Sequence, residues 1–294
     1  MTTTLRPAGP EERAEDGGRS RTYDIRVNSR RVGSVRLRAV PGPGGPPGAT
    51  PESRGTGVPA AVGRVEELRV EPGERRRGRA TVALLAAEEI LRGWGCARAE
   101  AGVAEEAAAG LALASALGYR EYSRHLVKEV SGAPEPPASR AVRPMDEADF
   151  GRWRVRDRVE LERLLTGEGL SPEEAARKAD ASYRSLLPEG SATPGAVLSV
   201  LSVDGEDVGT LWVVPRGRSP RPDTEGWVYA VEVFEERRGR GHGRELMLAA
   251  ERACVAAGSG TLGLNVHAGN VPAHRLYAGL GYRPVERHLR KRLA

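Results

Sequence analysis

Hydrophobic residues alternate with polar ones in several short segments of the chain and recur at helical spacing in others. In the first half, strands are expected at residues 3–6, 24–27, 33–40 and 65–70, and helices at 81–92 and 108–117. In the first of these helices, Val82, Leu85 and Ile90 are apolar residues at helical spacing. Residues 119–130 fit a pair of strands.

The second half repeats this alternation of strands and helices. Strands are expected at residues 140–145, 197–203, 208–214, 226–233, 261–266 and 282–292, and helices at 146–165, 171–187, 243–257 and 272–279. Ser171 and Pro172 form a helix N-cap followed by proline at the first helical position. Asp204 and Gly205 form the turn of a hairpin.

Proline and glycine mark the boundaries between these segments. Residues 41–60 are rich in both and are expected to form a mobile loop, while residues 131–139 contain three prolines and fit an interdomain linker. A chain of 294 residues favours two domains. We therefore expect domains at 1–130 and 140–294.

The two halves are related by a duplication. A constant offset that places Arg75 on Arg238 also aligns three longer stretches without a gap, and these pair 85–88 with 248–251, 117–120 with 280–283, and 124–126 with 287–289. Shared bias toward Ala, Gly and Arg does not explain the matches, because they include Tyr, His and Lys in register. The fold class is therefore α/β with two tandem, related domains.

Composition adds few constraints. Hydrophobic residues make up 39% of the chain, the net charge is +5 and the sequence pI is about 9.5. The basic excess fits either a bias toward arginine or an anionic ligand such as a nucleotide phosphate. Cys96 and Cys254 lie in unrelated contexts, and no apolar run reaches the ~20 residues of a membrane span. We expect a cytoplasmic protein, a monomer or homodimer, without nucleic-acid or membrane partners.

A strand, a glycine-rich turn and a helix start follow one another at residues 231–244. Such a junction presents unpaired backbone N–H groups at a positive helix end, which favours a phosphate. The segment is neither a Walker loop nor a dinucleotide fingerprint. A nucleic-acid patch is the competing interpretation of its arginines. The residues that form the turn are Arg238, Gly239, Arg240, Gly241, His242, Gly243 and Arg244.

A second polar loop precedes the last predicted helix. Asn270 either caps this helix or bonds a cofactor, and Tyr277 either packs or donates a proton to a leaving group. Both interpretations of each residue remain open from sequence alone. Histidines are scattered, with no acid completing a ligand set, so we expect no metal.

Together the two segments resemble the GNAT superfamily of acyl-CoA N-acyltransferases. Residues 238–243 are similar to its motif A, and Asn270, Ala273, Tyr277, Gly281 and Tyr282 to its later signature. The resemblance implies mixed, mainly antiparallel sheets flanked by helices and splayed after the motif A strand. It also implies acetyl-CoA as co-substrate, with its pantetheine on the amides of Val231, Glu232 and Val233, its pyrophosphate on 238–244, and Tyr277 as the acid for the departing thiolate.

The implied reaction is direct attack of a primary amine, of a small molecule or a peptide, on the acetyl thioester. Candidate bases are Glu232, Glu225 and His267, and a water chain is a further candidate. Asn265 stands where relatives that acetylate ribosomal proteins carry a glutamate, which argues against that substrate class. Acidic side chains in 146–187 favour a cationic amine. The alternatives are an acyl-CoA-binding sensor or scaffold without turnover, and a mycothiol-type thiol precursor as substrate.

The first half keeps only part of these motifs. Arg75, Gly78 and Ala80 match motif A, but Ala107 and Ala114 replace the counterparts of Asn270 and Tyr277. The chain before Tyr23 is too short for the two helices that build an acceptor pocket in the family. The resemblance therefore predicts a degenerate N-terminal domain, which supports the fold or binds CoA without turnover. An RNA-binding or nuclear-localisation role for 75–79 is a weaker alternative.

Overall fold

The computed structural model describes residues 2–14, 17–41, 61–132, 134–135, 140–167 and 170–293. Its chain divides into two compact units: unit 1 contains Met1–Tyr122 and Glu286–Ala294, and unit 2 contains Ser123–Val285. These units differ from the expected domains 1–130 and 140–294 in two segments. Residues 123–130 belong to unit 2, and residues 286–294 belong to unit 1. Residues 42–60 of the expected loop and most of the expected linker, 131–139, lie outside the described residues.

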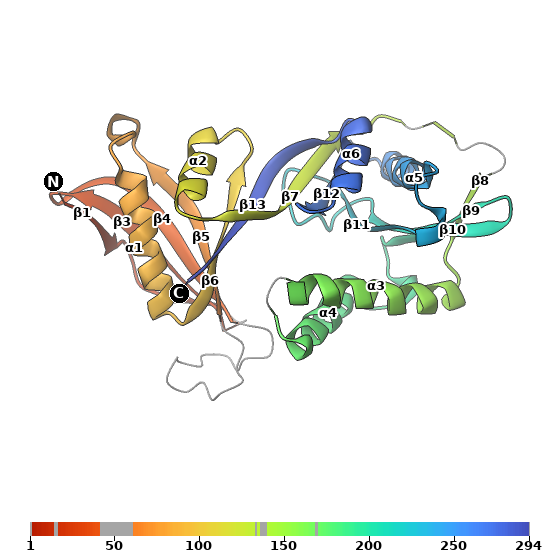
Figure 1. The fold of residues 1–294 in the computed structure, drawn as a ribbon, viewed down its shortest axis with the longest axis horizontal. Coiled ribbons are helices and arrows are strands. Elements are labelled where there is room, and N and C mark those ends of the chain that lie inside the picture. The colour runs from red at the N-terminus through yellow and green to blue at the C-terminus, as the bar shows by residue number, and fades with distance from the viewer. Residues whose placement is uncertain are drawn as a thin grey trace. The chain divides into compact units, whose positions relative to one another are not determined.

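Unit 1 is a mixed sheet with helices packed against it. Its strand order is β1-β3-β4-β5-β6-β13, β2 pairs with β3, and β5 and β6 alone are parallel. Helix α1 lies against the sheet (Figure 1). It buries Leu84, Ala87 and Leu91 in the core between them. The elements are β1 (Thr3–Pro7), β2 (Glu12–Arg13), β3 (Arg19–Val27), β4 (Arg30–Val40), β5 (Ala61–Val70), the 3₁₀ turn η2 (Pro72–Glu74), α1 (Arg79–Gly93), β6 (Cys96–Ala104), α2 (Ala108–Ala116) and β13 (Arg283–Arg292) from Glu286 onward.

Unit 2 is a mixed sheet between two helical layers (Figure 1). Its strand order is β7-β12-β11-β10-β9-β8, and only β11 and β12 run parallel. The elements are β7 (Arg120–Glu129) from Ser123 onward, β8 (Arg140–Pro144), α3 (Glu147–Gly167), α4 (Pro172–Leu186), η3 (Gly190–Ala192), β9 (Val197–Val203), β10 (Glu206–Val214), β11 (Gly226–Val233), η4 (Glu235–Arg237), α5 (His242–Ala256), β12 (Thr261–His267) and α6 (Val271–Gly279).

Successive side chains of β10 point to opposite faces of the sheet, so this strand contributes to the hydrophobic core on both sides of unit 2. Leu211 and Val213 pack with α5 and α6, whereas Trp212, between them in the sequence, packs with α3 and α4. Each face is therefore buried under its own pair of helices, and the sheet carries hydrophobic residues on both sides. The helix pair α3 and α4 was expected from sequence, and its capping box at Ser171 and Glu174 is present.

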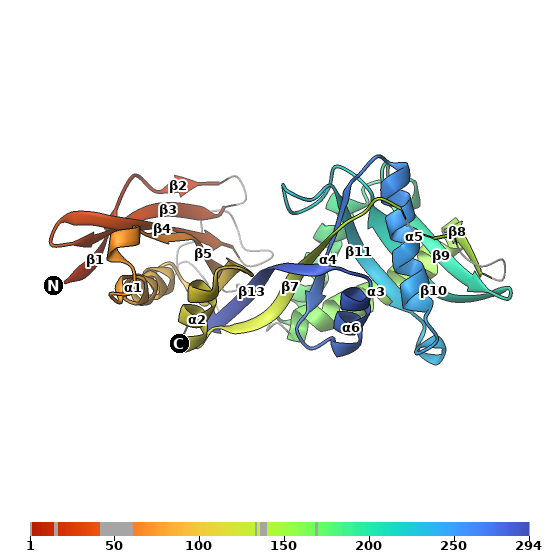
Figure 2. The ribbon, with the colours of Figure 1, turned by 90° about the horizontal axis from the view of Figure 1, so that it is seen from above.

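Each sheet is completed by a strand from the other half of the sequence (Figure 2). In unit 1, β13 pairs with β6 from Glu286↔Ala104 to Arg292↔Arg98. In unit 2, β7 pairs with β12 from Thr261↔Glu129 to His267↔Ser123. The two halves thus exchange their last strands.

One expectation for secondary structure was wrong, and strand β6 was not predicted. Instead of a pair of strands at 119–130, Arg120–Glu129 form one continuous strand, β7, because no turn residue interrupts the segment. Strand β6 was not expected, since Cys96–Ala104 is rich in alanine and has a single β-branched residue. Its strand conformation comes from pairing with β5 and β13.

Candidate active site

The turn between β11 and α5 is a run of free backbone donors. Gly239 and Gly241 adopt left-handed φ angles of 78° and 83°, which glycine accepts without steric cost. Among the described residues, none accepts a hydrogen bond from the backbone N–H groups of 239–243. Because these donors stand at the positive end of a 15-residue helix, the turn favours an anion.

Three side chains supply charge around this turn. Arg238 Nε donates to the carbonyl of Val233 at 3.2 Å, and Arg244 donates to that of Gly279 at 3.4 Å. Arg240 forms no hydrogen bond or ion pair with any described residue. His242 is buried, and its pKa is lowered by desolvation and by Arg140, Arg240 and Arg237, so its imidazole is neutral.

Strand β11 leaves the sheet on one side as it approaches the turn. Its parallel pairing with β12 covers only Gly226, Trp227 and Val228. Its antiparallel pairing with β10 continues to Val233 and is displaced by a bulge after Val228. Residues 229–233 therefore present an edge without a β12 partner within these described strands. This is the expected splay, and it includes Val231, Glu232 and Val233.

Helix α6 reaches the same place from the other side. A Cβ added at Gly243 would lie 3.1 Å from Leu276 Cδ2 and 3.7 Å from Val233 Cγ2, so α5, α6 and β11 converge there. Asn270 caps α6, because its Oδ1 accepts from the backbone N–H of Ala273 at 3.2 Å. The structural interpretation of Asn270 is thus observed.

Tyr277 lies on α6 with a buried ring and an unpaired hydroxyl. The residue is 8% exposed, and its ring packs edge-on against Tyr282 with centroids 6.0 Å apart. Burial raises the pKa of Tyr277 to about 12, so the phenol keeps its proton at neutral pH. No described residue hydrogen-bonds its hydroxyl, which leaves the proton available for a ligand.

The candidate bases lie at different places. Glu232 is on the free edge of β11, where it accepts from Thr210 Oγ1 at 3.3 Å and faces Arg156 Nε at 3.5 Å. Glu225 lies at the opposite end of β11 and accepts from the backbone N–H of Gly260 at 2.6 Å. His267 ends β12, and its carbonyl contacts His274 Nε2 at 3.2 Å. Of the three, only Glu232 shares the end of β11 that reaches the glycine turn.

The helices expected at 146–165 and 171–187, now α3 and α4, lie on the side of the sheet where the amine acceptor is expected to bind, and no individual residue of theirs was predicted to contact it. The structure places Asp157 of α3 and Tyr183 of α4 together, with Tyr183 Oη donating to Asp157 Oδ2 at 2.6 Å. The available signal was that Asp157 follows buried Trp153 by one helical turn and precedes Leu161 by another. An acidic residue in an apolar helical stripe is unusual for ordinary surface packing.

The corresponding turn of unit 1 keeps the backbone and two of the arginines, Arg75 and Arg77, but replaces one of the glycines. Gly78 has a φ of 72°, but Arg76 holds a left-handed φ of 61° where unit 2 has Gly239. Ala107 begins α2 without a side-chain cap, and Ala114 is buried. Among the described residues, no α-helix precedes β5.

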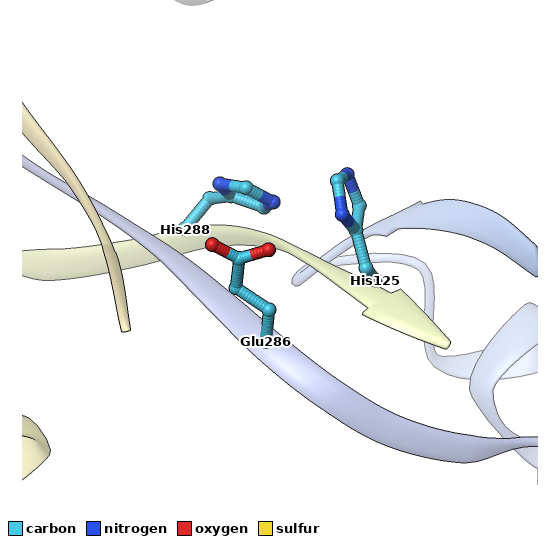
Figure 3. A group of neighbouring side chains, drawn as sticks. All are labelled: His125, Glu286 and His288. Atoms are coloured by element: carbon cyan, nitrogen blue, oxygen red, sulfur yellow. The ribbon is translucent and has the colours of Figure 1, made fainter. Parts of the chain in front are cut away.

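The repeated histidines lie on the exchanged strands. Figure 3 shows His125 on β7, and Glu286 and His288 on β13. His125 packs edge-on against Trp227 at 4.9 Å in unit 2, and His288 lies 6.2 Å from the Tyr122 ring in unit 1.

Comparison with known proteins identifies the family. The model of the acetyltransferase (GNAT) family matches residues 4–119 and again 160–282. The chain is 30% identical over 133 residues to an uncharacterized N-acetyltransferase, YycN, of Bacillus subtilis (strain 168), an alignment that spans 45% of this chain and 83% of that protein. A second uncharacterized N-acetyltransferase of that strain, YdgE, is 25% identical over 44% of this chain and 82% of its own length.

Solved structures agree on the tandem architecture. A tandem GNAT protein from the clavulanic acid biosynthesis pathway covers 96% of this chain and 85% of its own, with a TM-score of 0.51 and 20% identity. A GCN5-related N-acetyltransferase from Sphaerobacter thermophilus covers 92% and 80%, with a TM-score of 0.57 and 16% identity. Within the described residues, no helix is long and apolar enough to cross a membrane. With both halves matched, this chain belongs to the GNAT acetyltransferase family as a tandem two-domain member.

Proposed function

We propose that unit 2 transfers an acetyl group from acetyl-CoA to a primary amine, with Tyr277 as general acid. The observation that carries the proposal is the run of unpaired amides at 239–243, which lies beside the free edge of β11 and the tyrosine helix. Phosphate oxygens are strong acceptors and suit such donors. Family membership supports acyl transfer from acetyl-CoA in general.

The residues of unit 2 suit the parts of acetyl-CoA. The amides of 239–243, with Arg238, Arg240 and Arg244, are proposed to hold the pyrophosphate. The free edge at Val231, Glu232 and Val233 is proposed to pair with the pantetheine amides, as an added strand would. Ala273 and Tyr277 on α6, with Asn270 at its start, are proposed to face the thioester end of the cofactor.

The chemistry is a direct displacement: the amine nitrogen bonds to the thioester carbonyl carbon, the C–S bond breaks, and the sulfur takes a proton. Tyr277 is proposed to give that proton, because its phenol is neutral and its hydroxyl is free. Glu232 is the best placed of the three bases to accept the proton from the attacking amine, directly or through water. Arg156 and Thr210 hold its carboxylate in place.

Calorimetric titration with acetyl-CoA, followed by a thiol-release assay against a panel of primary amines, tests the proposal. We expect one binding site, located in unit 2, and thiol release that depends on the amine. Two sites would show that unit 1 also binds cofactor. Binding without release for any amine would support the sensor or scaffold alternative, and no binding would overturn the assignment of the glycine turn.

A further inference from the structure

The acceptor side of unit 2 contains a carboxylate with an unusual environment. Asp157 lies on α3 and is partly buried, and its hydrogen-bonding partner is the hydroxyl of Tyr183 on α4. No lysine or arginine forms an ion pair with Asp157 among the described residues. A partly buried carboxylate without a cation is costly to keep charged, which points to a cation supplied by a ligand.

The charged groups around Asp157 further favour a cation next to its carboxylate. Burial raises the pKa of Asp157, the Tyr183 bond lowers it, and the charges of Glu232 and Glu160 raise it further. The nearby arginines are engaged elsewhere: Arg156 lies over the Phe234 ring at 4.9 Å and faces Glu232, and Arg158 pairs with Glu162 and Asp180. Arg154 lies over the Tyr183 ring at 5.4 Å. The electrostatic environment of Asp157 therefore favours an added positive charge.

Aromatic rings continue from this carboxylate to the free strand. Tyr183 packs edge-on against Trp153, Trp153 against Trp212, and Trp212 stacks on Tyr229 of β11 with centroids 4.7 Å apart. These rings belong to one buried cluster between α3, α4 and the sheet. Because Tyr183, Trp153 and Trp212 are buried and packed on one another, they fix the Tyr183 hydroxyl, and with it the Asp157 carboxylate, at the side of the helical layer that faces β11.

We propose that Asp157, held by Tyr183, binds a second cationic nitrogen of the acceptor, so that the preferred substrates are diamines rather than monoamines. The proposal rests on the acetyltransferase function proposed above. Glu232, on β11, faces the nitrogen that attacks, while Asp157, on the helical layer, binds the nitrogen that remains charged. One amine of the acceptor is thus deprotonated near Glu232 and reacts, while the other stays protonated and pairs with Asp157.

The test compares 1,4-diaminobutane with butylamine, which differ by the distal amine. In the wild-type protein we expect a kcat/KM that is about tenfold to a hundredfold higher for the diamine, as for a charge-assisted hydrogen bond. Asp157→Asn keeps an acceptor for Tyr183 and removes the charge. It is expected to raise KM for the diamine by about the same factor, while KM for butylamine changes little.

Asp180→Asn is the matched control. Asp180 lies on α4 and pairs with Arg158 at 2.8 Å, so its loss removes one negative charge from the same helical layer without touching Asp157. We expect it to leave the diamine preference intact. Equal loss of preference in both variants would mean a general field effect and would overturn the assignment to Asp157.

The failure of this inference and that of the proposed function are distinguishable. Thiol release with both amines at equal efficiency would overturn diamine selection and leave the acetyltransferase in place. If no amine is acetylated, calorimetric titration of the CoA-saturated protein with 1,4-diaminobutane still tests the site. Binding that is lost in Asp157→Asn would support the site, and absence of binding by the wild-type protein would overturn it.

Discussion

The two units contain the same buried ion pair, each built across the exchange of strands. In unit 2, Lys128 of β7 contacts both carboxylate oxygens of Glu251 at 2.8 Å and lies 5.6 Å from the Tyr282 ring centroid. In unit 1, Lys291 of β13 contacts Glu88 at 2.9 and 2.7 Å and lies 5.7 Å from the Tyr119 ring centroid. Both glutamates are 1% exposed.

The glycine turns of the two units diverge where the chemistry would take place. Unit 2 has glycine at both left-handed positions, a capped α6 and a buried tyrosine. Unit 1 has an arginine at one of these positions, and its Glu74 is surrounded by Arg30, Arg77 and Arg79. Both halves have therefore kept what assembles each sheet. In unit 1, however, Arg76, Ala107 and Ala114 stand at the places of Gly239, Asn270 and Tyr277.

The largest expected effect is a loss of acetyl-CoA binding when the glycine turn of unit 2, but not that of unit 1, is substituted. Gly241→Glu places a carboxylate and a strained φ at the anion-binding turn of unit 2, and it should abolish acetyl-CoA binding and turnover. Gly78→Glu is the matched change at a φ of 72° in unit 1, and it should leave both nearly unchanged. Calorimetric titration and thiol release measure the two effects.

The reverse result would exchange the roles of the units. Loss of binding in Gly78→Glu with normal binding in Gly241→Glu would place the working cofactor site in unit 1. Circular dichroism of both variants shows whether each remains folded, so that a loss of binding is not confused with a loss of structure.

The next largest effect concerns the tyrosine that unit 1 lacks. Tyr277→Phe removes the free hydroxyl and keeps the ring that packs on Tyr282. We expect kcat to fall by about 10²-fold or more, the usual contribution of a general acid, while acetyl-CoA affinity stays within about twofold. Steady-state kinetics and calorimetry measure these quantities, and an unchanged kcat would remove Tyr277 from the mechanism.

The sequence predicted the tandem architecture because the matched residues are those that build it. The helix-start glycine, the buried glutamate and the Leu-Gly-Tyr turn recur at one offset in both halves. The motif A turn could also be predicted, because its glycines lie within a few residues of one another in the sequence.

The exchange of strands and the Asp157 cluster were not predicted, because both depend on partners that are distant in the chain. Lys128 and Glu251 are 123 residues apart, and nothing in either local segment specifies that they meet. Tyr183 meets Asp157 across two helices, 26 residues apart, and its role depends on the burial of that contact. Strand β6 was missed because its sequence has weak strand propensity and its pairing is nonlocal.

A third prediction compares the two ion pairs. Lys128→Met leaves Glu251 buried without another ion pair among the described residues and should destabilise unit 2 by about 3–5 kcal/mol. Lys291→Met should destabilise unit 1 by less, because Glu88 keeps a second cation in Arg92 at 3.9 Å. Hydrogen exchange measured by mass spectrometry reports on each unit separately. The double variant Lys291→Met, Glu88→Leu should recover most of the loss, because it removes the buried charge as well.

These results would show whether the exchanged strands serve the two units equally. Equal losses would mean that Arg92 does not compensate for Lys291 and that the duplicated pair has one structural role in both units. A loss confined to one unit would mean that the other is held mainly by its apolar core, and a loss below about 1 kcal/mol in both would contradict the structural role of the pair.

The smallest expected effect tests the left-handed position at which unit 1 carries Arg76 and unit 2 carries Gly239. Arg76→Gly relieves a left-handed residue whose cost is about 1–2 kcal/mol, but it adds about 0.5–1 kcal/mol of chain entropy to the unfolded state. A net stabilisation of about 0.5 kcal/mol is expected, seen as a rise in Tm of about 2 °C for unit 1. Gly239→Arg in unit 2 should lower stability by a similar amount. If Arg76→Gly instead destabilises unit 1, the arginine side chain contributes more contact energy than its backbone costs, and the left-handed position has been retained for that contact.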